Sequence, residues 1–244
     1  MGKINSMEYF DKFVSLGRDC HTALMIRCKY FNDVSNEKEF FFNEKLFKSK
    51  SYPHGAYLFD WIINQPLGLY KCLNSKFVGI NDFENFRLQP TGRYRRPIPI
   101  NDLYGMSFNH FSKDLTRQTY YASNKQKIDL YFEKIFRETI RKYEYLVNKM
   151  LDLLNSKQKI LFVYNDYKQK TESSFFAELL SLLNNFNCDA SLLVVGKNRT
   201  NDITQTPKLY FENTIRKGKW NPSHVEEYTS WMKAMENFKM KDVK

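Results

Sequence analysis

The sequence lacks the features that would place it in several common classes of protein. Its four cysteines form no CxxC pair and follow no regular spacing, which excludes a disulfide framework and a zinc ribbon. No HExxH motif, GxGxxG fingerprint or P-loop is present, and no two histidines stand at metal-ligand spacing. We therefore expect no nucleotide cofactor and no structural metal.

Long apolar segments are also missing. Apolar runs such as Ala190–Val195 are far too short to cross a bilayer, and the first residues contain no apolar stretch typical of a secretion signal. We expect no transmembrane segment, and we expect the protein to work in the reducing cytoplasm.

The chain nevertheless has the material for a large core. Of its 244 residues, 42% are hydrophobic and 16% are aromatic, and a chain of this size buries about 73% of the surface that its unfolded form exposes. This composition excludes a disordered protein. Without a repeat or a low-complexity linker, we expect one domain, residues 1–244, with insertions at about 32–56 and 75–125.

The charge of the chain is strongly positive. Lys and Arg total 38 against 27 Asp and Glu, a formal net charge of +11, which favours anionic partners. Basic residues are dense only at Arg93–Arg96 and Arg216–Lys219, and no zinc finger, helix-turn-helix or RNP motif accompanies them. We therefore expect an anionic or glycan small molecule as the ligand, bound in part by Arg93 and Arg95, and no nucleic acid.

Hydrophobic patterns predict an α/β protein. Buried strands are expected at 12–16, 159–164 and 191–195, and helices at 20–30, 67–73, 128–154, 174–186 and 226–239. The strand–helix–strand order over 159–195 implies a parallel unit with a right-handed crossover. We predict a Rossmann-like three-layer α/β fold with a mostly parallel sheet and an irregular helical and loop insertion.

The segment Ser15–Cys20 is the first candidate site. A buried strand runs into Gly17, and Cys20 then begins a helix behind Asp19, a good N-cap. A thiol there faces unpaired backbone N–H groups and the positive end of the helix dipole, which stabilise the thiolate, and Arg18 adds a positive charge. Ligands of open α/β sheets bind at this carboxyl edge. Alternatively, Cys20 is a small buried hydrophobe, the common fate of a lone cysteine.

Three further segments could serve such a nucleophile. Asp60, beside Trp61 in an apolar run, either orients a base or binds substrate, or else caps a segment or pairs with an arginine. His110, between Asn109 and a phenylalanine, is either a general base or a core histidine bonded to the backbone. Asn165 ends a strand and either orients a histidine or forms an ordinary turn.

These motifs, taken in order, are shared with a known family. The matching positions are Ser15–Gly17 with Cys20, Asp60–Trp61, Asn109–His110, Arg137, Arg141, Ile160–Val163, Leu193–Val195, Trp220, Tyr228 and Trp231. Over about residues 11–235 the chain resembles a bacterial family of uncharacterised proteins described as papain-like cysteine peptidases, a domain of unknown function whose relatives often occur beside glycan-assembly functions.

The resemblance implies Cys20 as the nucleophile and His110 as the base, with Asn165, Asp166 or Asp60 orienting the base. The predicted architecture of this chain departs from that of papain-like enzymes. Those enzymes have a helical half and a barrel-like half, whereas this chain predicts a long helix and a parallel strand–helix–strand unit after the histidine.

Three hypotheses follow. The first is a cysteine-dependent hydrolase or acyltransferase with Cys20 and His110 as its centre. Its further site residues are Asp60 and Asn165 for catalysis, and Gly17, Arg18, Asp19, Trp61, Asn109, Arg93 and Arg95 for substrate binding. The second is a glycan-assembly transferase that binds a sugar or sugar nucleotide, with Cys20 structural. The third is a non-catalytic module that binds an anionic ligand.

Overall fold

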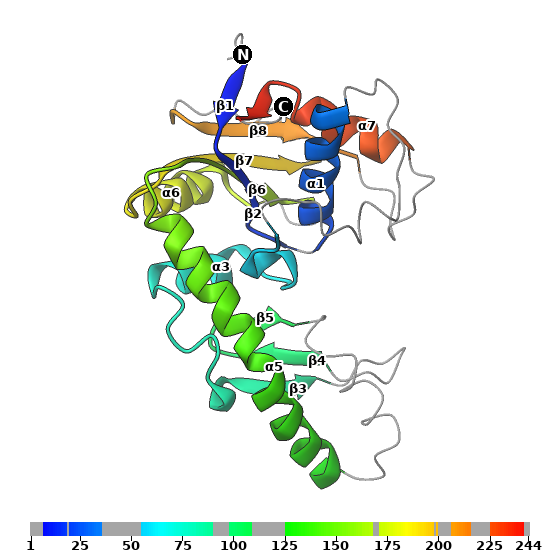
Figure 1. The fold of residues 1–244 in the computed structure, drawn as a ribbon, viewed down its shortest axis with the longest axis vertical. Coiled ribbons are helices and arrows are strands. Elements are labelled where there is room, and N and C mark those ends of the chain that lie inside the picture. Colours follow the sequence, from blue (N-terminus) through cyan, green and yellow to red (C-terminus); the bar gives the residue numbers. More distant parts are fainter. Residues whose placement is uncertain are drawn as a thin grey trace.

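A parallel sheet of four strands lies in the upper part of the molecule as drawn in Figure 1. The computed structural model describes residues 7–18, 20–35, 55–89, 98–108, 125–167, 171–197, 199, 206–215 and 225–241. The strands, in their spatial order, are β2 (Lys12–Ser15), β6 (Lys159–Asn165), β7 (Asp189–Gly196) and β8 (Leu209–Asn213). All three pairings are parallel, so the four carboxyl ends lie at one edge.

The central strands are buried on both faces, which explains their continuous apolar sequences. Side chains alternate across the sheet, so that Phe162 and Val194 enter one hydrophobic cluster while Leu161 and Val163 enter the other. The sheet is therefore the middle of three layers.

One outer layer contains the helices at the two ends of the chain. They are α1 (Cys20–Ser35) and α7 (Val225–Ala234), and they contribute Met25, Ile26, Tyr228 and Trp231 to one cluster. A separate parallel pair, β1 (Glu8–Phe10) with β9 (Phe238–Met240), adds Phe10 and Phe238 to this cluster. Chain segments from both ends thus enclose the same core.

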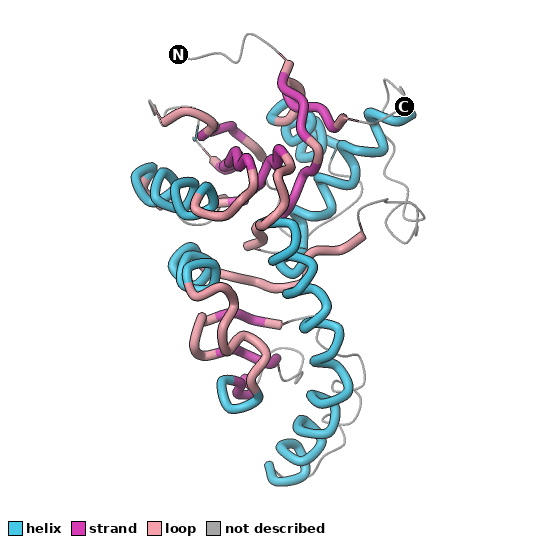
Figure 2. Tube along the Cα trace, turned by 60° about the vertical axis from the view of Figure 1, so that its left-hand side comes forward, coloured by secondary structure: helices cyan, strands magenta, loops and turns pink. Residues whose placement is uncertain are grey.

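The other outer layer comes from the middle of the chain. Apolar faces of α3 (Pro66–Asn74), α5 (Lys125–Leu154) and α6 (Ser173–Asn184) form the larger cluster with the sheet. Figure 2 shows that the long helix α5 continues well beyond the sheet. There α5 lies beside an antiparallel sheet, whose strands are β3 (Phe86–Gln89), β4 (Ile98–Asn101) and β5 (Met106–Ser107). Two 3-10 turns, η1 (Leu58–Asp60) and η2 (Phe83–Asn85), complete the elements.

The predicted α/β class with a parallel main sheet is confirmed, and two details are wrong. The helix expected over 226–239 ends at Ala234, and the chain continues as β9. The stretch at 75–125 was expected to be irregular apart from a short strand or extended loop over 106–111, but its described part contains the three strands β3, β4 and β5. These strands are short, and β4 contains Pro99, so their sequences carry little periodic signal.

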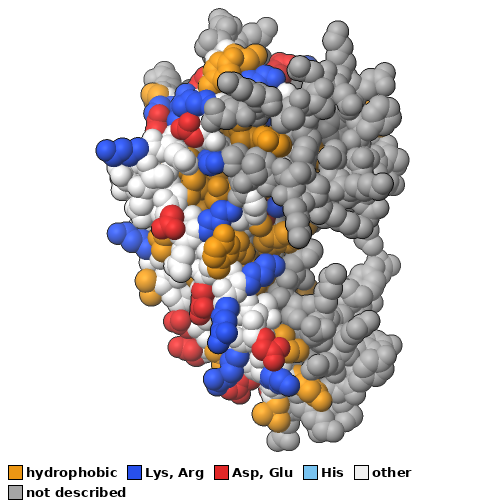
Figure 3. All heavy atoms as spheres, in the orientation of Figure 1, with side chains coloured by type: hydrophobic (Ala, Val, Ile, Leu, Met, Phe, Trp, Pro, Cys, Tyr) orange, Lys and Arg blue, Asp and Glu red, His pale blue; other side chains and the backbone are white. Residues whose placement is uncertain are grey.

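Charged side chains of both signs are interspersed over the described part of the face seen in Figure 3. No single basic patch dominates that part of the surface. None of the helices in the described ranges is long and apolar enough to cross a membrane.

Candidate functional site

A sharp turn joins β2 to α1 and places Cys20 at the carboxyl edge of the sheet. Gly17 and Arg18 both have left-handed backbone conformations, with φ of 86° and 72°, and Cys20 is the first residue of the helix. A Cβ atom on Gly17 would lie 2.5 Å from the Asn64 side-chain nitrogen and 3.2 Å from the Phe59 carbonyl oxygen. Glycine is thus required both by the conformation and by the space.

The fully buried Asn64 holds this turn in place. Its side-chain Nδ2 donates to the Leu16 carbonyl at 2.8 Å, and its Oδ1 accepts from the Arg18 N–H at 3.4 Å. On the other side, Ser15 Oγ accepts from the Gly17 N–H at 3.0 Å. Sequence reasoning missed Asn64, because nothing in its local sequence indicates a bond to a turn 46 positions earlier.

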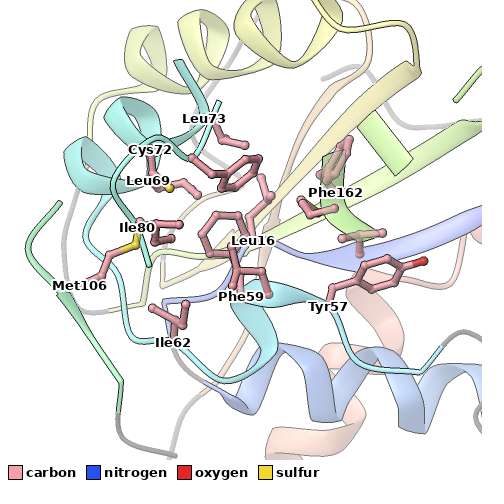
Figure 4. Close-up of a cluster of buried hydrophobic side chains, with 14 of the residues drawn as sticks. Leu16, Tyr57, Phe59, Ile62, Leu69, Cys72, Leu73, Ile80, Met106 and Phe162 are labelled. Atoms are coloured by element: carbon pink, nitrogen blue, oxygen red, sulfur yellow. The ribbon is translucent and has the colours of Figure 1, made fainter. Parts of the chain in front are cut away.

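Apolar anchors fix the segment that carries Asn64. Figure 4 shows Tyr57, Phe59 and Ile62 in the same hydrophobic cluster as Leu16, which follows β2. Phe59, Ile62 and Leu16 are fully buried in one cluster. The turn before Cys20 is therefore supported by the core as well as by hydrogen bonds.

Cys20 differs from the other three cysteines in its exposure. None of the four is in a disulfide, and Cys20 alone is exposed. Burial raises the pKa of the Cys28 thiol to about 12 and that of Cys188 to about 11, and it also raises the pKa of Cys72. Since thiolates are the reactive species, the other three cysteines are suited to packing rather than to chemistry.

His21 follows Cys20 but serves a different purpose. Successive helical side chains diverge by about 100°, and His21 is buried with its Nε2 3.0 Å from Glu227 Oε1 on α7. Its ring also meets Trp231 edge-on at 5.6 Å. His21 thus links the beginning of α1 to α7, and no local pattern identifies Glu227 as its partner.

Asp60 is buried against α1, away from the first turn of that helix. Its Oδ2 accepts from Arg27 Nη2 at 3.2 Å and from the Tyr57 N–H at 3.1 Å. Burial raises the pKa of Asp60 to about 6, although Arg27 and the Tyr57 N–H oppose this shift. Arg27 lies about two helical turns beyond Cys20, so these contacts correspond to the arginine pair and backbone cap that the sequence offered as the structural alternative.

Asn165 and Asp166 lie where β6 ends, and both make local structural contacts. Asn165 Oδ1 accepts from the Tyr167 N–H at 3.0 Å, which closes a turn. The buried Asp166 forms an ion pair with Arg199, and it accepts from the N–H and the hydroxyl of Thr171, both at 2.9 Å. Arg199 was not identified from the sequence.

Several predicted site residues cannot be placed. Asp19, Arg93, Arg95, Asn109 and His110 lie outside the described residues. Trp61 is half-buried, with the Arg27 guanidinium carbon 5.8 Å and Lys142 Nζ 5.3 Å from its ring centroid. Gly17, Arg18 and Cys20 are therefore the predicted residues that the structure brings together.

In the described part of the chain, no three His, Cys, Asp or Glu side chains are grouped so that they could hold a metal ion. Comparisons with models of known families, with curated proteins and with solved structures find no match. A function can therefore be inferred only from the residues of the candidate site and their geometry.

Proposed function

We propose that this protein is a cysteine-dependent acyl-transfer enzyme, a hydrolase or an acyltransferase, with Cys20 as its nucleophile. The observation that carries the proposal is the position of Cys20. It is the one exposed cysteine, it begins a 16-residue helix, and it follows a buttressed left-handed turn at the carboxyl edge of a parallel sheet. The sequence motifs that resemble those of the family described as papain-like cysteine peptidases also support the proposal.

The chemistry follows from that position. The Cys20 thiolate attacks an acyl carbon, and the developing oxyanion accepts from backbone N–H groups at the beginning of α1. His110 is the proposed base: it takes the thiol proton and returns it to the leaving group. Water or a second acceptor then cleaves the thioester, which regenerates the thiol. Gly17 and Asn64 position the turn, and they take no part in proton transfer.

We further infer that the fold is Rossmann-like and that the protein works in the cytoplasm. Helices on both faces of a parallel sheet support a Rossmann-like three-layer arrangement, in which ligands bind at the carboxyl edge. Four cysteines outside disulfides support a reducing cytoplasm as the working compartment. An anionic or glycan small molecule is the proposed class of ligand.

Competitive alkylation tests the assignment of the nucleophile. Limiting iodoacetamide at about pH 7 should modify Cys20 before the other cysteines and faster than it modifies free cysteine, as measured by peptide mass spectrometry. Replacing Cys20 with alanine should remove the fast phase. The matched control is Cys28→Ser, since Cys28 is on the same helix but half-buried, and this change should leave the fast phase intact.

A Cys20 thiol that reacts no faster than free cysteine would contradict the proposal. Saturable stabilisation by a sugar nucleotide that survives Cys20→Ala, together with slow alkylation, would instead favour the glycan-assembly transferase.

A further inference from the structure

A cavity of about 500 Å³ opens at the amino edge of the main sheet, the edge opposite Cys20. Three helices end beside it. The helix α3 ends at the lining residue Asn74, while the lining residues Asn155 and Asn185 directly follow α5 and α6. Because α5 and α6 lead into β6 and β7, their ends lie where those strands begin. The volume falls within the range of small-molecule sites, about 300–1,000 Å³.

Amide side chains dominate the wall of this cavity. Four of its lining residues are asparagines: Asn74, Asn155, Asn185 and Asn187. Within the wall, Asn187 Nδ2 donates to the Asn155 backbone carbonyl at 3.2 Å. The side chains of Asn74, Asn155 and Asn185 are exposed and have no hydrogen-bond partner among the described residues. Since an amide carries both donors and an acceptor, these groups can bind a hydroxyl in either sense.

The charges around the cavity favour a neutral ligand. Each helix carboxyl end carries a partial negative charge of about half an elementary charge, and three such ends together oppose an anion. The Lys76 ammonium belongs to the same wall and opposes a cation, and no Asp or Glu of the described residues lines the cavity to hold one. A neutral polar molecule avoids both penalties.

A sharp turn after α3 keeps Lys76 in this wall. Lys76 and Phe77 have left-handed φ values of 53° and 66°. Their N–H groups donate to the carbonyls of Leu73 and Cys72, at 3.0 Å and 2.9 Å. Helices commonly end on glycine in this conformation, whereas both positions here carry side chains. Because Phe77 is buried in the core, the fold fixes the backbone of Lys76 beside the amides.

We propose that this cavity binds a neutral sugar. The amides and the Lys76 ammonium provide donors and acceptors for neighbouring hydroxyls, and the half-buried Phe186 ring in the wall offers an apolar surface to the C–H face of a pyranose. The site lies at the edge of the sheet opposite Cys20, so it does not rest on the proposed function of that thiol.

Saturation-transfer-difference NMR tests the site with neutral sugars. The probes are glucose, galactose, mannose and N-acetylglucosamine, with maltose and diacetylchitobiose as disaccharides. The wild-type protein should bind at least one of the six saturably, and added sodium chloride should leave its dissociation constant unchanged. Tighter binding of a disaccharide than of its unit would identify a glycan chain as the source of the sugar, and the reverse order would identify a free sugar.

Variants of exposed residues locate the bound sugar. Asn74→Ala combined with Asn185→Ala removes two amides from the wall and should weaken binding about tenfold. The matched control Asn148→Ala removes an exposed amide from α5 outside the lining, and it should change the affinity by less than about twofold. Lys76→Gln keeps a donor but loses the charge, so binding of a neutral sugar should fall by less than about threefold.

Three results would overturn the proposal. One is a wild-type protein that binds none of the six sugars. Another is salt-dependent binding of inorganic pyrophosphate in place of a sugar, which would make the cavity an anion site. The third is equal sugar affinity in the double variant and in Asn148→Ala, because the sugar would then lie elsewhere. Binding should persist in Cys20→Ala, so the result is independent of whether Cys20 proves reactive.

Discussion

At the scale of single residues, the geometry before Cys20 depends on Gly17. Its φ of 86° is a conformation that side chains with a Cβ adopt at a cost, and its neighbours Asn64 and Phe59 leave no room for that atom. A Cβ atom at position 17 would therefore cause both backbone strain and a collision with neighbouring atoms. These two contributions can be separated by comparison with another glycine.

We predict that Gly17→Ala lowers the free energy of unfolding by about 3 kcal/mol, the sum of left-handed strain and overpacking. Gly105 offers the control, because its φ is 63° but nothing lies within 4 Å of an added Cβ. Gly105→Ala should therefore cost only about 1 kcal/mol. Urea unfolding measures both values, and equal losses would show that the collision with Asn64 is not real.

Local sequence was enough to predict the surroundings of Cys20 but not its supports. The strand, the glycine and the first helical turn are adjacent in the chain, so their pattern could be interpreted directly. Asn64 and Glu227 reach the same region from 46 and 206 positions away. A single sequence contains no signal for such pairings, since any buried asparagine or glutamate could have several partners.

At the scale of elements, the Asp60–Arg27 contact joins η1 to α1. Asp60 is almost fully buried, and burial raises its pKa from the ordinary 3.8 to about 6. Between these two pH values the folded protein keeps a proton that the unfolded chain has released. The free energy of unfolding must then fall as the pH rises through this window.

We expect this group to remove about 3 kcal/mol of stability from the wild type between about pH 4 and pH 7. Asp60→Asn cannot release a proton there, so its stability should decline less over the same range, whatever constant cost it pays for losing the pair with Arg27. Urea unfolding at several pH values measures the difference. Parallel profiles for the two proteins would contradict the burial of an ionisable Asp60.

Elements with long periodic patterns were predicted well, as was the short strand β2, whereas the short strands β3 and β4 and the end of the chain were not. The buried runs of β6 and β7 and the apolar stripe of α5 extend over enough residues to identify the element. The end of the chain was misassigned because Trp231, Met235 and Phe238 continue a helical spacing. The structure shows why the helix stops: Phe238 and Met240 are buried beside β1, with which β9 pairs.

At the scale of the whole molecule, the topology gathers distant segments at one edge. Parallel pairing of β2, β6, β7 and β8 directs Cys20, Asn165 and Thr214 towards the carboxyl edge of one sheet. At this edge Asp166 forms an ion pair with Arg199, and the Cys20 thiol is exposed.

In the proposed mechanism Cys20 forms a covalent acyl intermediate, and direct detection of that intermediate is the sharpest test of the mechanism. After brief incubation with p-nitrophenyl acetate and an acid quench, peptide mass spectrometry should find one acetyl group on Cys20. The adduct should be absent from Cys20→Ala, and it should form more slowly in His110→Ala. An acetyl group confined to lysines, or one that appears on Cys20 no faster than on free cysteine, would contradict the account.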